Sequence, residues 1–431
     1  MGKMDIISTI TDRIKGRKLS IMNMGYYFMA SFIPMVINLF LSPVYSLYMT
    51  AEDFAIVGYF TSLTALFSPF ILFYMNQFYM REYFFRQGKD RENLRATLYK
   101  ANIIFPFIVT ALVLLCVYAY MCIINKESNI SFSPYAFISF FTIAFAGIYR
   151  LDLIDFKVQR KGKQYLGISV VNTLFLLFFS VLFVVVLKLG ATGKLLGTMM
   201  PALAMFIWSF RRHTDLFRFT FDWHLFKDSL VFCAPLVLAA MMGFFSGGYD
   251  KVYLERHVTL NQLGVYSIGL TIASYLNVFS TAIGETFGPD IYESIAAENN
   301  KRAIQFILIQ LGIMLCIVIA FILLAKYAII ILTANRYVDS TPYARIASIA
   351  AITNMIYFNI TPYILAKKKT NIILFAKITG GIACIITYSV VIKQFGCVGA
   401  AWCFALCPLY FTLFAIVFYM LCRLATKTKE I

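Results

Sequence analysis

The sequence predicts an all-α membrane protein of twelve spanning helices in two similar six-helix halves. Three observations carry this prediction. Of the 431 residues, 61% are hydrophobic and only 14% are charged, whereas soluble globular chains are about 45–50% apolar and about 25% charged. Twelve apolar segments are long enough to cross a bilayer. The basic residues gather in alternate loops, as the positive-inside rule requires of a multi-pass protein.

Each apolar segment is expected to be a helix, because lipid offers no hydrogen-bond partner to open backbone groups. An amphipathic helix over residues 1–21 precedes them, with isoleucines at helical spacing and basic residues nearby, as in helices that lie on a membrane surface. The spans are expected at 22–48, 55–80, 101–124, 132–150, 165–187, 192–210, 229–249, 263–287, 304–325, 343–365, 371–392 and 398–422. Many contain a proline, which predicts either a simple kink or a broken helix that lines a cavity.

The distribution of basic residues predicts the orientation. With the N-terminus in the cytoplasm, 28 of the 38 Lys and Arg residues fall in inner segments and 9 in outer loops or helix ends. This bias places both termini in the cytoplasm of a multi-pass protein of the plasma (inner) membrane. An odd number of spans would scramble the alternation, so the count also favours twelve.

Weak internal repeats divide the chain. The segment Leu189–Gly193 parallels Phe395–Gly399 at an offset of 206 residues, and three further matches have a similar offset. Six spans are therefore followed by six in the same orientation, as in transporters built from parallel repeats. The expected parts are a cytoplasmic amphipathic helix at 1–21, an N-terminal half at 22–210, a cytoplasmic linker at 211–228, a C-terminal half at 229–422 and a cytoplasmic tail at 423–431.

Catalytic, cofactor and metal chemistry is not indicated. The nine cysteines lie in apolar stretches without a Cys-x-x-Cys pair, and the three histidines are scattered. The aromatic residues lie in apolar runs and do not alternate with basic residues, which argues against nucleic-acid binding. We therefore expect no enzyme, no catalytic residue, no metal site and no cofactor.

Charged residues at membrane depth are the candidate binding residues, because such residues are rare there and usually functional. Each of these charges also has a purely structural explanation: its side chain extends to the lipid headgroups, forms a surface ion pair or anchors a helix end. The functional interpretation is a cationic lining between the halves that binds substrate. The candidates are Arg81, Arg150, Lys377, Asp250, Lys251 and Glu285.

Several motifs resemble one transporter family. They are Ser42-Pro43 followed by Glu52–Tyr59, Tyr249–Leu254 followed by Leu263–Ser267, Ile330–Thr333, and the Gly396-x-x-Gly399-Ala400-Ala401 turn. Together they are similar to oligosaccharide flippases (O-antigen or polysaccharide-unit translocases) of the multidrug/oligosaccharidyl-lipid/polysaccharide exporter superfamily. The drug-extrusion branch typically carries an acid in its first helix, and span 22–48 has none.

The resemblance implies a flippase that moves undecaprenyl-diphosphate-linked oligosaccharide units from the inner to the outer leaflet, for O-antigen, lipopolysaccharide or capsular polysaccharide assembly, by alternating access. The implied partners are that lipid-linked oligosaccharide, the lipid bilayer and a polysaccharide polymerase. Two alternatives stay open: a drug or cation exporter of the same fold, and a membrane-embedded polysaccharide polymerase. The short outer loops argue against the polymerase, because they leave no room for an active site.

Overall fold

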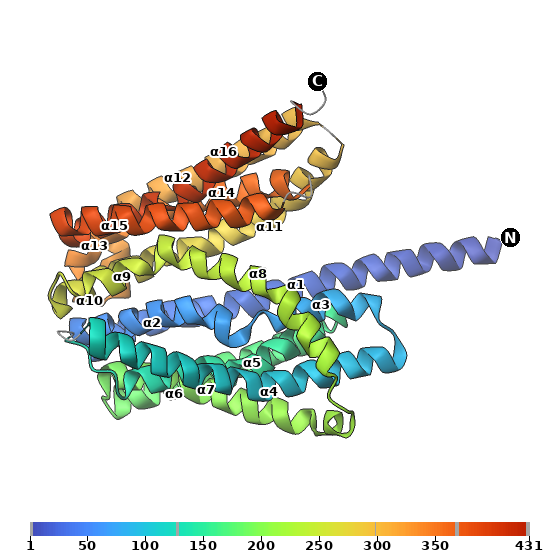
Figure 1. Cartoon of the computed structure of the whole chain (residues 1–431), viewed down its shortest axis with the longest axis horizontal. Helices are drawn as coiled ribbons and strands as arrows, with labels where there is room; N and C mark the ends of the chain where they lie inside the picture. The colour runs from blue at the N-terminus through green and yellow to red at the C-terminus, as the bar shows by residue number, and fades with distance from the viewer. Residues whose placement is uncertain (1–2, 126–128, 298, 367–369, 428–431) are drawn as a thin grey trace. The chain divides into compact units, whose positions relative to one another are not determined.

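The computed structural model describes residues 3–125, 129–297, 299–366 and 370–427, and these residues are nearly all helical, without a strand (Figure 1). Ten segments within them are long and apolar enough to cross a membrane, which makes the chain a multi-pass membrane protein. They are Gly25–Tyr48, Ala51–Phe85, Gly88–Ile123, Tyr135–Val158, Gly162–Val186, Gly190–Arg212, Trp223–Gly247, Leu260–Ile295, Asn300–Leu332 and Ile372–Cys422.

These ten segments account for the twelve predicted crossings, because one segment is long enough to cross twice and α14 adds another crossing. Ile372–Cys422 has 51 residues, about 77 Å of helix, which is more than twice a hydrocarbon core of about 30 Å. Its backbone breaks at Gly396, whose φ of 54° is the left-handed conformation that glycine adopts readily. Helix α14 (Ala350–Ala366) has 17 residues, which is at the lower end of the length that crosses a bilayer. The prediction of an all-α membrane protein with twelve crossings is therefore confirmed in the part of the chain that the structure describes.

The helices pack into two compact units. Unit 1 comprises residues 1–42, 71–114 and 137–233. It contains most of α1 (Lys3–Tyr48), α3 (Met75–Phe85), most of α4 (Gly88–Ala119) and α5 (Tyr135–Val158), then α6 (Gly162–Ser180), the π-turn Val181–Val186, α7 (Gly190–Arg212), the 3₁₀ turn Thr214–Arg218 and the start of α8 (Trp223–Gly247). Its core gathers Phe78, Tyr79 and Tyr99 with aliphatic residues of α4 and α5.

Unit 2 comprises residues 43–70, 115–136 and 234–431. It holds most of α2 (Ala51–Leu72), the turn Tyr120–Ile124, α9 (Tyr249–Leu254), α10 (Leu260–Ser274), α11 (Leu276–Ala296), α12 (Asn300–Leu332), the turn Val338–Ser340, α13 (Thr341–Ser348), α14, α15 (Thr370–Leu406) and α16 (Pro408–Lys427). Its core is built around the fully buried Tyr266 and Tyr388.

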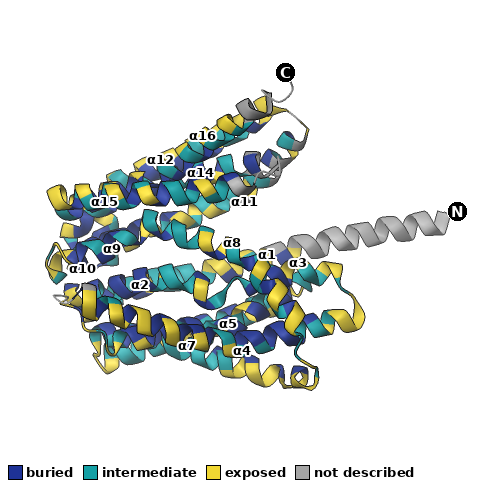
Figure 2. Cartoon of the chain, viewed as in Figure 1, coloured by how far each residue is buried: buried dark blue, intermediate teal, exposed yellow. Residues whose placement is uncertain are grey.

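Large apolar side chains are exposed along many helices, and Figure 2 shows exposed residues along α4, α15 and α16. Phe40 is 72% exposed and Ile331 70%. Such surfaces would be unfavourable in water and are expected where helices face lipid.

The units do not coincide with the predicted halves. Residues 43–70 and 115–136 come from the first half and belong to unit 2. Helix α1 also continues without a break past residue 21, where a separate amphipathic helix was expected to end. The domain limits remain a prediction, because compact units report packing and not repeat boundaries.

Candidate functional site

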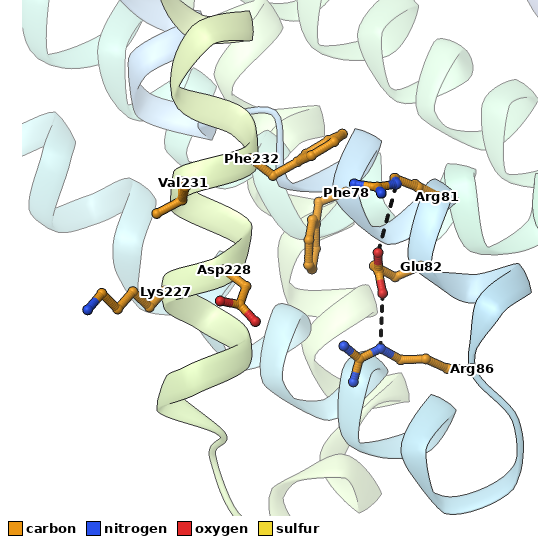
Figure 3. Close-up of a pocket in the computed structure, with 8 residues that line it drawn as sticks. All are labelled: Phe78, Arg81, Glu82, Arg86, Lys227, Asp228, Val231 and Phe232. Atoms are coloured by element: carbon orange, nitrogen blue, oxygen red, sulfur yellow. Dashed lines mark hydrogen bonds and ion pairs between the residues drawn. The ribbon is translucent and has the colours of Figure 1, made fainter.

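A charged pocket lies in unit 1 between α3 and α8 (Figure 3). Its volume is about 400 Å³. Residues 78, 81, 82 and 86 fall at helical spacing, so they share one face of α3 and its C-terminal end. The lining residues are Phe78, Arg81, Glu82, Arg86, Lys227, Asp228, Val231 and Phe232.

Arg81 of α3 and Arg86, which directly follows α3, both lie near the carboxylate of Glu82. The Nε atom of Arg86 lies 3.2 Å from one oxygen of Glu82, and the Nε atom of Arg81 lies 3.9 Å from the other. The second distance is too long for a hydrogen bond. The Arg81 side chain is 53% exposed, and its guanidinium carbon lies 4.8 Å from the centre of the Phe232 ring. Arg81 is therefore placed against an aromatic ring with donors available to a ligand.

The α8 side of the pocket combines an acid and an aromatic ring. In Figure 3, Asp228 and Phe232 face the side chains of α3, whereas Lys227 extends from the other side of α8. Asp228 is one helical turn from His224 and lies 3.1 Å from its Nδ1 atom. The lining holds three basic and two acidic side chains. A guanidinium beside aromatic rings can bind a phosphate through paired N–H donors while the rings contact a sugar.

The other predicted site residues lie elsewhere. Arg150 is exposed on α5 and does not line the pocket. Lys377 is half-buried on α15, with its ammonium nitrogen 5.9 Å from the centre of the Tyr357 ring. Glu285 belongs to α11, but its side chain lies outside the described residues.

Asp250 and Lys251 are adjacent on α9 and have different surroundings. Asp250 is fully buried, and one of its oxygens accepts a hydrogen bond of 2.6 Å from the Tyr266 hydroxyl. Its other oxygen has no hydrogen-bond partner among the described residues. Lys251 is half-buried, and its aliphatic chain packs beside Gly58. Of the five predicted residues whose side chains the structure describes, only Arg81 lines the pocket, and the binding role of all six remains a prediction.

A second polar cluster in unit 1 was not expected from the sequence. Asp152 and Asp155 lie one turn apart on α5, and both are buried. Asp152 accepts hydrogen bonds from the hydroxyls of Tyr99 (2.8 Å) and Ser209, and lies 2.6 Å from Nε2 of His213. We call Asp152, Asp155 and the side chains that contact them the Asp152–Asp155 network.

Asp155 completes this network with partners from two other helices. It accepts hydrogen bonds from the Tyr79 hydroxyl of α3 at 2.6 Å, from Gln159 at 2.6 Å, and from the Arg95 guanidinium of α4 at 3.1 Å. The network therefore joins α3, α4, α5 and the end of α7. Buried carboxylates require such partners, since an unpaired buried charge is very costly.

A set of contacts inside unit 2 fixes the C-terminal end of α1. The guanidinium of Arg336 donates to the carbonyls of Ser46 (2.8 Å) and Leu47 (2.6 Å), and the Tyr337 hydroxyl donates to the carbonyl of Met49 at 2.7 Å. Burial raises the pKa of Tyr337, so this hydroxyl stays protonated and remains a donor. Carbonyls at a helix end lack partners within the helix, and a guanidinium satisfies them while opposing the helix dipole.

The second part of this set holds residues 120, 125 and 129. Glu255 is buried and accepts hydrogen bonds from the Asn125 side chain (2.9 Å) and the Asn129 backbone N–H (3.2 Å). Arg256 donates to the Tyr120 hydroxyl at 2.7 Å. We call the contacts of Arg336, Tyr337, Glu255 and Arg256 with residues 46, 47, 49, 120, 125 and 129 the end clamp.

Comparisons with known proteins agree with this architecture. A family model described as polysaccharide biosynthesis protein matches residues 47–342. No curated protein sequence matches the chain. A structure of the lipid II flippase MurJ in an inward closed conformation matches with a TM-score of 0.64 at 15% identity, over 91% of this chain and 86% of that one.

Two further solved structures share the fold. An inward-facing multidrug resistance transporter of the MATE family in the MOP superfamily matches with a TM-score of 0.62 at 12% identity, over 92% of this chain and 94% of that one. A MOP-superfamily transporter from Pyrococcus furiosus matches with a TM-score of 0.53 at 13% identity, over 95% and 97%. At such identities the likeness shows a shared fold, and it is the fold of transporters.

Proposed function

Because the chain belongs to the polysaccharide biosynthesis protein family and has the MOP-transporter fold, we propose that it moves undecaprenyl-diphosphate-linked oligosaccharide units from the inner to the outer leaflet of the plasma membrane. The observation that carries this proposal is the pocket in which Arg81 and Arg86 face Phe232 and Asp228. Its guanidinium groups suit a diphosphate and its aromatic rings suit a sugar. In this proposal both termini are cytoplasmic and the product supplies O-antigen or capsule assembly.

The physical problem solved by such a protein is desolvation. A diphosphate and many hydroxyls cannot enter hydrocarbon unpaired, because each buried unpaired polar group costs several kcal/mol. A pocket that replaces water with charged donors removes that cost. MurJ, which shares the fold, is a lipid II flippase, and this supports a lipid-linked substrate here.

The membrane potential can drive the lipid-linked substrate outward. An inside-negative potential favours outward movement of an anion by about 2.3 kcal/mol per charge per 100 mV. Two uncompensated diphosphate charges would therefore gain roughly 4–5 kcal/mol at 100 mV. In the proposed orientation the end clamp lies on the outer side. It would have to open for release, as alternating access requires.

Loss of the gene tests this function against its rivals. The proposal expects single lipid-linked units to accumulate in the inner leaflet, where an impermeant glycosidase cannot reach them in intact cells. Accumulation of single units in the outer leaflet would instead indicate a polymerase. Unchanged polysaccharide with loss of dye efflux would indicate a drug exporter, and either result would refute the proposal.

A further inference from the structure

Unit 1 carries an exposed basic surface that is separate from the pocket. A short turn joins α5 to α6, and residues 156–164 around it contain four Lys or Arg residues and no acid. The end of α7 lies beside α5, and residues 208–220 contain three arginines and one acid, Asp215. We call five exposed side chains of this surface the basic rim: Lys157, Arg160, Lys161, Lys163 and Arg212.

Two aromatic rings hold Arg212 at this surface. Its guanidinium carbon lies 4.4 Å from the centre of the Phe156 ring on α5 and 5.3 Å from the Trp208 ring, which is one turn earlier on α7. Phe156 is 1% exposed and Trp208 is 38% exposed. The rings contact the guanidinium without using its N–H donors, so these donors can pair with the oxygens of a phosphate.

The turn between α5 and α6 is fixed to α1. The side chain of the buried Asn23 donates to the carbonyl of Arg160 at 2.9 Å and accepts from the N–H of Gly162 at 3.2 Å. The backbone of the turn is therefore held, while its basic side chains are exposed. Among the described residues, no side chain of the basic rim forms an ion pair with a carboxylate.

The basic rim lies where three spanning segments begin or end. They are Tyr135–Val158, Gly162–Val186 and Gly190–Arg212. Basic and tryptophan side chains at the ends of such segments lie at the depth of the lipid headgroups. Farther along the same helices the surface is apolar, since Val171 of α6 is 44% exposed and Ile207 of α7 is 43% exposed. A molecule that matches this surface has an anionic head and an apolar tail.

We propose that the basic rim binds anionic phospholipids, with the Arg212 guanidinium on the phosphate and Trp208 at the depth of the headgroup. The positive charge favours an anionic lipid over a zwitterionic one. The exposed apolar side chains beside the rim favour a lipid over a nucleic acid or an acidic protein, which would leave them uncovered. This inference does not rest on the proposed function, because none of these residues lines the pocket.

Fluorescence quenching of Trp208 measures the preference for lipid. The chain has three tryptophans, so Trp223→Phe with Trp402→Phe leaves Trp208 as the only one. This full-length protein is reconstituted in phosphatidylcholine vesicles, in which a fixed fraction of lipid is replaced by brominated phosphatidylglycerol or brominated phosphatidylcholine. We expect at least twofold stronger quenching by the phosphatidylglycerol. The difference should disappear in about 1 M NaCl, where the Debye length is about 3 Å.

A triple variant tests whether the basic rim is the cause. Arg212→Gln with Lys161→Gln and Lys163→Gln, made in the Trp208-only protein, should be quenched equally by the two brominated lipids. The matched control combines Trp208→Phe with Trp223→Phe and keeps Trp402, which is 44% exposed on α15 of unit 2. It should show no preference. If the triple variant does not fold, the salt dependence of the Trp208-only protein still decides the proposal.

Three results would overturn the proposal. Equal quenching of Trp208 by the two brominated lipids would show that the rim does not select anionic lipid. No quenching by either lipid would place Trp208 away from the membrane and indicate a partner in water. A preference that persists in the triple variant, or that Trp402 shares, would belong to the protein surface in general and not to the basic rim.

Discussion

At the scale of single residues, function depends on where each charge finds a partner. Arg81 meets an aromatic ring and a distant carboxylate, so its donors are available to a ligand. Arg95 is bound to a buried carboxylate, so it stabilises the fold. The two arginines belong to the same unit, and we expect Arg81 to bind substrate and Arg95 to stabilise the fold.

Arg81→Gln should slow flipping of the lipid-linked oligosaccharide about ten- to a hundredfold. The loss corresponds to about 1.5–3 kcal/mol, the contribution of a hydrogen bond to a charged group. The measurement is the initial flipping rate in proteoliposomes. Arg211→Gln removes an exposed arginine of the same unit outside the pocket and should leave the rate unchanged. Equal rates for the wild type and Arg81→Gln would exclude Arg81 from substrate binding.

Arg95→Ala should destabilise the protein by about 3 kcal/mol, because it leaves Asp155 buried without its cation. The estimate is at the low end of the usual range since the Arg95 side chain is 29% exposed. Thermal unfolding in detergent measures the effect, and Arg211→Ala is the control. An unfolding temperature equal to that of the control would show that Asp155 does not need this partner.

At the scale of helices, unit 2 is held at one end by the end clamp and by close backbone contacts. The clamp joins the end of α1 and residues 120, 125 and 129 to residues that follow α9 and α12. Beside it, α10 approaches the start of α2 so closely that a Cβ on Gly264 would overlap the carbonyl oxygen of Ala51. Glycine is required here because any side chain would push the two helices apart.

Arg336→Gln should loosen the end of α1, because Ser46 and Leu47 lose their charged donor. We expect the buried Ser46→Cys to react with a water-soluble maleimide several times faster in this background. Arg345→Gln is a matched control, since Arg345 also donates to a carbonyl, that of Ile322, but within the second half. Equal labelling rates in the two backgrounds would mean that Arg336 does not hold α1.

Gly264→Ala should lower stability by about 1–3 kcal/mol, the usual cost of overpacking, since its methyl group meets the Ala51 backbone. Gly312→Ala serves as the control, because a Cβ placed there meets no atom within 4 Å beyond the backbone of its own helix. Unfolding temperatures of both variants in detergent provide the comparison. A Gly264→Ala protein as stable as Gly312→Ala would contradict the close approach of α10 and α2.

At the scale of the whole molecule, hydropathy was enough to predict the helices, because each span must satisfy its own backbone in lipid. The exact helix ends were less predictable: α15 and α16 join across Cys407, and α2 is followed by a break at Phe73 and Tyr74, whose positive φ angles have no clear signal in the sequence.

The site was only partly predictable. The sequence indicates Arg81 because this residue follows an apolar run, whereas Arg86 and Lys227 are only two of the many basic residues in the inner segments. The spacing of residues 78, 81, 82 and 86 is a signal that could have revealed the α3 face of the pocket. The Asp152–Asp155 network joins residues as distant as Tyr79 and His213, so it depends on tertiary packing that no local pattern encodes.

The central claim, that the protein flips a lipid-linked oligosaccharide, is tested most directly by reconstitution. Purified protein is placed in liposomes with fluorescent undecaprenyl-diphosphate-linked oligosaccharide, and an impermeant quencher reports which leaflet each lipid occupies. The account predicts protein-dependent exchange between leaflets that is accelerated by a potential negative on the side of origin and slowed by Arg81→Gln. Quenching that stops at the outer-leaflet fraction with wild-type protein, together with uptake of a cationic dye by the same liposomes, would contradict it.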